Sequence, residues 1–270
     1  MINRWIITGD THGRTETRLK NIELNYKLTS MESVGVIILG DAGINYYLNN
    51  TDKKWKKVIN NLGIYVYCVR GNHEARPQDI EGMTILDDEN VGNFVLYEPN
   101  YPYIRYFLDG ASYNLVDGDK THKALVLGGA YSVDKHWRLQ NGATWFSNEQ
   151  LSQEEMRKIE SVWDGCEFDL ILSHTCPISW QPTDLFLGFI DQSQVDNSME
   201  KWMEEFKDKI KWDAWLFGHY HDDRIVRPHV EMYFNDYEDL SEIVGRWHRY
   251  DESGELDWWL KKDPNFYMGV

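Results

Sequence analysis

Apolar residues in the first third of the chain fall into short runs separated by segments with helical spacing. Runs at residues 5–8, 34–39 and 64–69 predict three strands. Apolar residues at helical spacing lie between these runs, at 19–26 and again at 55–62. This alternation predicts parallel strands joined by crossover helices.

Residues 91–130 carry a different pattern, in which turn residues separate short β segments. These segments are residues 93–97, 103–108, 112–116 and 123–128. Their hairpin-like spacing predicts a second, partly antiparallel sheet.

The second half of the chain returns to alternating helices and strands. A helix is expected to begin near Ser147, where Ser152 and Glu155 have the spacing of a capping box. The pattern then predicts a strand at 168–172, a helix at 199–210, a strand at 214–217 and two final strands at 230–234 and 243–250.

No internal repeat or low-complexity linker divides this pattern. We therefore expect one domain over residues 1–250, with a C-terminal tail at 251–270 that packs on the same domain. The hydrophobic fraction of 42% and aromatic fraction of 14% supply a large core and exclude an intrinsically disordered chain.

Cysteine content and the N-terminal sequence indicate the compartment. The three cysteines form no CxxC pair, so neither a disulfide framework nor a thiolate zinc site is expected. The chain shows no signal-peptide pattern, and its longest apolar stretch is far shorter than the roughly 20 residues that span a bilayer. We expect a cytoplasmic protein that does not interact with membranes.

The charge balance limits the class of partner. With 28 Lys and Arg against 44 Asp and Glu, the formal net charge is −16. Binding of extended nucleic acid through phosphates needs a basic face, so this charge disfavours it. A locally positive or metal-loaded cleft is still compatible with the composition.

Polar motifs follow five of the predicted strands. They are GDTHG at 9–13, GDAG at 40–43, RGNHE at 70–74, SHTCP at 173–177 and GHYH at 218–221. Glycines within them let the chain turn sharply and approach a ligand without interference from a Cβ. Because ligands bind at the carboxyl ends of strands in α/β sheets, we expect the five loops to converge on one rim.

The residue types in these loops favour metal binding. Asp10 with His12, and His219 with His221, are pairs two residues apart, which point to the same side on extended backbone. Together the loops offer two Asp, one Asn and four or five His without a thiolate, a set that suits Mn, Fe or Zn better than Ca²⁺. The number of ligands exceeds the need of one ion, which favours two ions sharing a carboxylate.

The ordered series GDxH, GDxG, GNHE, a lone His after a strand, and GHxH resembles the calcineurin-like metallophosphoesterase superfamily, over residues 9–221. This resemblance implies an α/β fold, a four-layer α/β/β/α sandwich with two mixed β-sheets flanked by helices. It also implies a dinuclear centre of two divalent metal ions.

The resemblance further implies roles for individual residues. Seven metal ligands are implied: Asp10, His12 and His221 on one ion, Asn72, His174 and His219 on the other, and Asp41 bridging them. His73, the histidine of GNHE, would lie beyond the ions and protonate the leaving group or stabilise charge.

The implied activity is hydrolysis of a phosphate ester by a hydroxide that bridges the two ions. Its substrate would be a phosphorylated small molecule, a nucleotide or a phosphopeptide. A phosphodiesterase, nuclease or nucleotide hydrolase with the same centre is the alternative. A non-catalytic scaffold is disfavoured, because such relatives lose metal ligands and every expected position is filled here.

Substrate contacts are less clearly marked. The GDxxDRG arginine typical of relatives that act on protein phosphoesters is absent from GDAGINYY. We expect Arg76, or Arg138 in the segment at 128–138, to contact the substrate phosphate, although a purely structural role is equally compatible. The apolar segment at 180–190 could wall the active site or pack on a neighbouring subunit.

Overall fold

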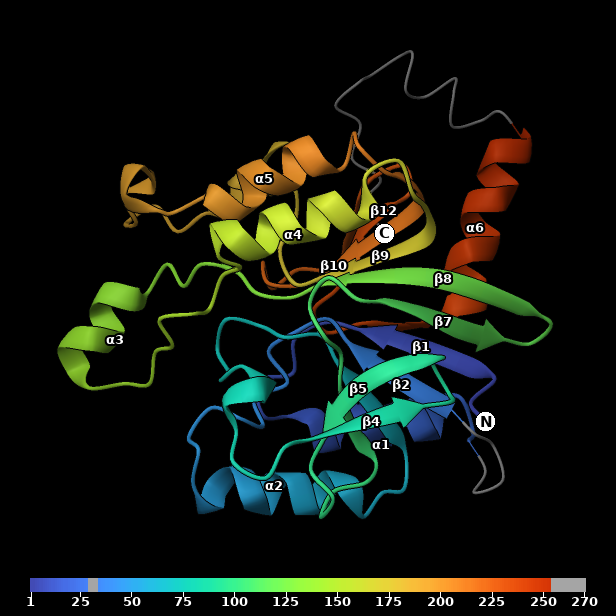
Figure 1. The fold of residues 1–270 in the computed structure, drawn as a ribbon, viewed down its shortest axis with the longest axis horizontal. Helices are drawn as coiled ribbons and strands as arrows, with labels where there is room; N and C mark the ends of the chain where they lie inside the picture. Colours follow the sequence, from blue (N-terminus) through green and yellow to red (C-terminus); the bar gives the residue numbers. More distant parts are fainter. Residues whose placement is uncertain (29–33, 254–270) are drawn as a thin grey trace.

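Two mixed β-sheets pack face to face in this computed structural model, which describes residues 1–28 and 34–253 (Figure 1). In spatial order, the first sheet contains β13 (Tyr237–Asp239), β1 (Arg4–Thr8), β2 (Val34–Ile38), β3 (Tyr65–Cys68), β6 (Ile104–Tyr106), β5 (Asn93–Tyr97) and β4 (Thr84–Asp88). The second contains β11 (Arg224–Arg227), β12 (Val230–Met232), β10 (Lys211–Phe217), β9 (Glu167–Ser173), β8 (Lys120–Leu127) and β7 (Ser112–Asp117).

Each sheet has a parallel centre and antiparallel edges. Strands β1, β2, β3 and β6 run parallel in the first sheet, and β8, β9, β10 and β12 run parallel in the second. The edge pairings β1–β13, β4–β5, β5–β6, β7–β8 and β11–β12 are antiparallel. Parallel neighbours end at the same edge, so each sheet presents several loops on one side.

Helices cover the outer faces of both sheets. They are α1 (Thr15–Asn25) and α2 (Asn50–Asn60) on the first sheet, and α4 (Gln153–Trp163) and α5 (Ser198–Phe206) on the second (Figure 1). The short α3 (Lys135–Asn141) projects away from the sheets, and α6 (Leu240–Ser253) lies at the side (Figure 1). Four 3₁₀ turns are described: Pro77–Asp79, Ile178–Trp180, Thr183–Leu185 and Gln192–Gln194.

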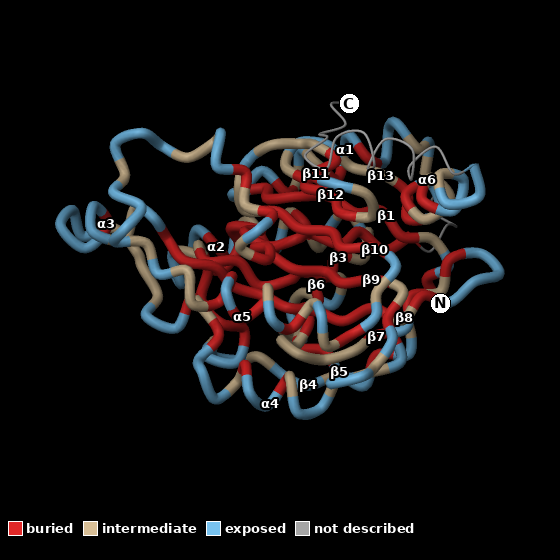
Figure 2. The backbone as a smooth tube through the Cα atoms, turned by 90° about the horizontal axis from the view of Figure 1, so that it is seen from above, coloured by how far each residue is buried: buried red, intermediate tan, exposed pale blue. Residues whose placement is uncertain are grey.

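Alternating side chains of the strands explain the layers. In β1, Trp5 and Ile7 belong to the core between the sheets, whereas Ile6 belongs to the core under α1 and α2. In β10, Leu216 faces the first sheet and Trp215 faces the layer of α4 and α5. Successive strand residues point to opposite faces, so each sheet buries both sides. Figure 2 shows this buried centre and the exposed α3. The predicted four-layer sandwich is confirmed.

Most predicted elements are present. Each strand predicted between residues 5 and 234 forms, close to its expected ends, and α1 and α2 occupy the two predicted crossovers. The capping box is confirmed, because Ser152 and Glu155 make both reciprocal hydrogen bonds. However, α4 begins at Gln153, after this cap, instead of near Ser147.

The segment at 91–130 does not form a sheet of its own. Strand β6 pairs with β3 and β5 pairs with β6, so the first part of the segment extends the first sheet. Strand β7 pairs with β8, and β8 runs parallel to β9 in the second sheet. The expected antiparallel pairing is present, but its strands are divided between the two sheets.

The strand predicted at 243–250 is wrong, because these residues lie within α6. Leu240, Ile243 and Trp247 bury one face of this helix, at helical spacing. The helix continues to Ser253, past the boundary predicted at 250. Residues 254–270 of the predicted tail lie outside the described residues.

Over residues 1–28 and 34–253, no helix has the length and apolar character needed to cross a bilayer.

Candidate metal centre and substrate contacts

The five polar loops meet at one place, at the carboxyl ends of β1, β2, β3, β9 and β10. In the described part of the chain, three groups of side chains have potential ligand atoms within 4.8 Å of one another. They are Asp10, His12 and His221; His12, Asp41 and His73; and Asp10, Asp41 and His174. Shared members make these groups one continuous cluster, contributed by both sheets, as the motif analysis predicted.

Left-handed backbone places several of these side chains. The φ angles of His12, Asp41, His219 and His221 are 44°, 48°, 73° and 57°. Non-glycine residues adopt this conformation rarely, at a cost of about 1–3 kcal/mol each, and they concentrate at functional sites. The surrounding fold therefore holds four candidate ligands in strained conformations.

Two glycines allow the loops to approach one another closely. A Cβ at Gly40 would lie 2.0 Å from Nδ1 of His174, and Gly40 has a φ of 99°. A Cβ at Gly71 would lie 1.9 Å from Oδ1 of Asp41. Both positions therefore require glycine for contact between loops, as the sequence predicted.

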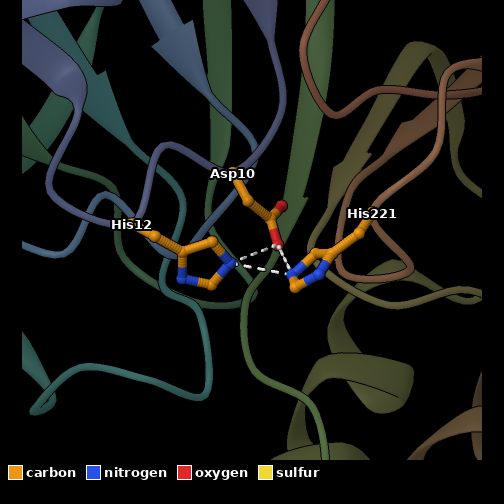
Figure 3. Close-up of side chains that lie close together, drawn as sticks. All are labelled: Asp10, His12 and His221. Carbon is orange, nitrogen blue, oxygen red and sulfur yellow. Dashed lines mark hydrogen bonds and ion pairs between the residues drawn. The ribbon is translucent and has the colours of Figure 1, made fainter.

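Asp10, His12 and His221, drawn in Figure 3, form the outer half of the cluster, in which both histidines are exposed and Asp10 is buried. Their side chains point toward one another, with 2.8 Å between the Nε2 atoms of the two histidines. Oδ2 of Asp10 lies 3.7 Å from Nε2 of His12 and 3.5 Å from Nε2 of His221. This oxygen is buried and has no hydrogen-bond partner among residues 1–28 and 34–253. A buried carboxylate oxygen facing two imidazole nitrogens fits a cation.

His174 and Asn72 form part of the inner half of the cluster, which is buried. The backbone oxygen of Leu39 lies 2.7 Å from Nδ1 of His174, so Nδ1 donates the proton there. Nε2 then faces Oδ1 of Asn72 at 2.9 Å, while Nδ2 of Asn72 donates to Ser132 Oγ. With both side chains in these orientations, two acceptors face each other, and a shared cation stabilises such a pair.

Asp41 lies at the centre of the cluster. Its Oδ2 is 3.9 Å from Nδ1 of His12, 3.8 Å from Nδ1 of His73 and 3.7 Å from Nε2 of His174. Its Oδ1 accepts a hydrogen bond of 2.8 Å from the backbone N–H of His73. Burial alone would raise the pKa of Asp41, but the charges of the neighbouring histidines lower it. An ionised carboxylate in this position is suited to contact two cations.

His219 lies beside His174 in the inner half. Its backbone N–H donates to Oδ1 of Asp10 at 3.0 Å, and its ring centroid lies 5.0 Å from that of His174. Burial, together with the charge of His174, lowers the pKa of His219 to about 3. The neutral imidazole that results is the form that binds metals.

Arg138, one of the two predicted substrate contacts, lies next to the cluster. Its Nη2 is 3.0 Å from Nδ1 and 2.9 Å from Nε2 of His73. Its other nitrogens contact Asp134 Oδ1 at 2.8 Å and the backbone oxygen of Thr144 at 3.0 Å. Arg138 is the one buried residue of α3. The fold thus fixes a guanidinium beside His73.

The guanidinium of Arg76 makes its hydrogen bonds to residues 148–155. Its Nε donates to the backbone oxygen of Asn148 at 2.7 Å, and its Nη2 donates to that of Gln150 at 2.6 Å. Its Nη1 donates to Glu155, the residue of the capping box. The structure therefore places the guanidinium of Arg76 at the start of α4, and a role in substrate binding stays a prediction.

Ser132 is a contact that the sequence did not single out. Asn72 Nδ2 donates to its hydroxyl at 2.8 Å. The available signal was the position of Ser132 after β8, a parallel neighbour of β9 whose carboxyl end lies at the same edge. Within the segment at 128–138, the sequence pointed to Arg138 and did not point to Ser132.

Comparison with known proteins identifies the family. The calcineurin-like phosphoesterase family model matches residues 4–223. No curated protein matches the chain. Among solved structures, the chain is similar to a phosphopantetheinyl hydrolase from Mycobacterium tuberculosis, with 12% identity, 86% of this chain and 88% of that chain covered, and a TM-score of 0.45. Because the family model spans most of the sequence, the chain belongs to the calcineurin-like phosphoesterase family.

Proposed function

We propose that this protein is a dinuclear metal-dependent phosphoesterase that acts on a small or peptide-borne phosphomonoester. The observation that carries the proposal is the meeting of two buried carboxylates, Asp10 and Asp41, with imidazoles from both sheets. Oδ2 of Asp10 lacks a hydrogen-bond partner within this cluster, which supports a cation there.

The residues present fit two ions. Asp10, His12 and His221 would hold one ion, Asn72, His174 and His219 would hold the other, and Asp41 would contact both. Mixed nitrogen and oxygen donors without thiolate favour Mn, Fe or Zn. When bound, two such cations neutralise phosphate oxygens and lower the pKa of water.

His73 and Arg138 would act on the substrate beside the ions. His73 is placed by its backbone hydrogen bond to Asp41, and we propose that its ring protonates the leaving group. Arg138 would bind a phosphate oxygen, because a guanidinium fixed by Asp134 and Thr144 loses little freedom on binding. A monoester presents the free oxygens that such a group recognises.

The test begins with the purified protein and its metals. Elemental analysis should find about two bound transition-metal ions per chain. The protein, supplied with Mn²⁺, should hydrolyse p-nitrophenyl phosphate faster than bis(p-nitrophenyl) phosphate. Removing the metal with a chelator should abolish hydrolysis, and adding Mn²⁺ should restore it.

Other outcomes would identify the alternatives. Preference for the diester would indicate the phosphodiesterase or nuclease, and release of phosphate from nucleotides alone would indicate a nucleotide hydrolase. No bound metal and no hydrolysis after addition of Mn²⁺ would overturn the proposal and indicate a non-catalytic scaffold.

A further inference from the structure

A chain of hydrogen bonds links Asn72 to Ser132 and Glu149. Nδ2 of Asn72 donates to Ser132 Oγ at 2.8 Å, and Ser132 Oγ donates to Oε2 of Glu149 at 2.5 Å. All three residues are buried. The proposed function gives no role to Ser132 or Glu149.

The direction of this chain follows from its last member. The carboxyl group of Glu149 faces three hydrogen-bearing groups: the backbone N–H of Ser132 at 3.1 Å, the Ser132 hydroxyl, and Nε1 of Trp145 at 2.9 Å. The backbone N–H and the indole N–H can only donate. Glu149 therefore accepts, and the Ser132 hydroxyl directs its hydrogen toward Glu149.

This direction fixes the carboxamide of Asn72. A hydroxyl whose hydrogen is used by Glu149 has only lone pairs left for Asn72, and a lone pair accepts from an amide NH₂. Nδ2 of Asn72 must then face Ser132, and Oδ1 must face Nε2 of His174 at 2.9 Å. The reversed amide would present N–H groups, which cannot ligate a cation.

Glu149 is itself held firmly. Its backbone oxygen accepts a hydrogen bond from Nη1 of Arg70. Nε of Arg70 donates to Oδ2 of Asp109 at 2.7 Å, and Nη2 of Arg70 donates to the backbone oxygen of Gly128 at 2.8 Å. Arg70 stands two residues before Asn72 in the chain. The same loop thus anchors both ends of the hydrogen-bond chain.

We propose that Ser132 and Glu149 are positioning residues, which keep the oxygen of Asn72 turned toward the candidate metal centre. The inference rests on the proposed function, because the role of Asn72 as a ligand belongs to that proposal. Loss of such outer partners of a metal ligand typically weakens metal binding about 10–100-fold.

Two variants test this role by different means. Ser132→Ala removes the acceptor of Asn72 Nδ2. Glu149→Gln keeps the shape of the side chain but replaces one acceptor oxygen with a donor, so its carboxamide cannot satisfy all three donors around it. Ser161→Ala and Glu154→Gln, on the outer surface of α4, are the matched controls.

The primary readout is the affinity of the metal-free full chain for Mn²⁺, measured by titration calorimetry. We expect Ser132→Ala and Glu149→Gln to weaken Mn²⁺ binding about 10–100-fold and the controls to leave it unchanged. Saturating Mn²⁺ should recover much of kcat in both variants, since neither residue contacts the substrate. If Ser132→Ala does not fold, the Mn²⁺ affinity of Glu149→Gln alone tests the positioning role.

The outcomes separate this inference from the proposed function. Wild-type Mn²⁺ affinity in Glu149→Gln and in folded Ser132→Ala would overturn the positioning role alone. Absence of Mn²⁺ binding by the wild-type chain would overturn the proposed function and this inference with it.

Discussion

The two halves of the candidate centre contain similar side chains but are held in different ways. In the outer half, the side chains of His12 and His221 are 31% and 49% exposed, and they contact each other and Asp10. In the inner half, the side chain of His174 is fully buried and hydrogen-bonded to Leu39. The ring of His174 is thus fixed by the protein interior, whereas the rings of His12 and His221 contact each other and Asp10, and His221 also stacks on Phe234.

This difference predicts unequal metal sites. Buried ligands with hydrogen-bonded partners lose little freedom when an ion binds, and the low dielectric of the interior strengthens their interaction with it. We therefore expect the inner site to retain its ion longer than the outer one when a chelator is added.

Asp41→Asn removes the negative charge that joins the two halves. We expect kcat for p-nitrophenyl phosphate to fall about 10³-fold, because a central electrostatic contact is lost. Circular dichroism should show an unchanged fold. His248→Asn, which changes an exposed histidine of α6, is the control. Near-normal turnover by Asp41→Asn would contradict the proposed centre.

His174→Ala and His221→Ala compare the halves directly. Removing the buried His174 leaves the oxygen of Leu39 without its partner and opens a cavity, which should lower the free energy of unfolding by about 3 kcal/mol. Removing the half-exposed His221 should cost less than about 1 kcal/mol. Urea unfolding of the metal-free variants measures both values. Equal losses would show that the two halves are held alike.

Gly40→Ala tests the contact between the loops of β2 and β9. The added Cβ would meet His174 Nδ1 and would require a residue other than glycine at φ 99°, so we expect a loss of about 2 kcal/mol in the free energy of unfolding. Gly118→Ala is the matched control, because Gly118 also has a positive φ but faces open space. Its loss should be about 1 kcal/mol. Losses of the same size would mean that backbone strain alone accounts for the effect.

Glu200 is buried and supports the inner half. It accepts a hydrogen bond of 3.0 Å from Thr175, the residue after His174, and burial raises its pKa to about 7. The folded state therefore binds this proton more tightly than the unfolded state, and stability falls as pH rises from about 4.5 to 7. Glu200→Gln should be more stable than wild type at pH 8, with no gain at pH 4.5. A gain of equal size at both pH values would exclude titration as its cause.

The convergence of the loops could be predicted from the sequence because its causes are local. Each motif directly follows an apolar run, and parallel strands end at the same edge of a sheet. The pairs Asp10 with His12 and His219 with His221 carried the metal prediction. The extended backbone expected for them is wrong, because His12, His219 and His221 have positive φ angles that the surrounding fold imposes. The contact of Arg138 with His73 depends on the orientation of α3, which no periodic pattern sets.

Long-range pairing and tertiary packing explain what the sequence did not predict. Hairpin spacing indicates that β5 and β6 are antiparallel, but only contact with β3 decides that they extend the first sheet. In α6, β-branched and aromatic residues favoured a strand. The side chain of Asp239, which accepts from the N–H of Ser241, and the spacing of the buried Ile243 and Trp247 were the helix signals.

The positive φ angles of His12, Asp41, His219 and His221 have a consequence for protein engineering. A peptide that carried any one of these loops would relax to an ordinary backbone shape and lose the direction of its ligand. Grafting the motifs onto another scaffold would therefore require the edges of both sheets, facing each other as they do here. The centre is a property of the sandwich, and its five short sequences transfer only together with it.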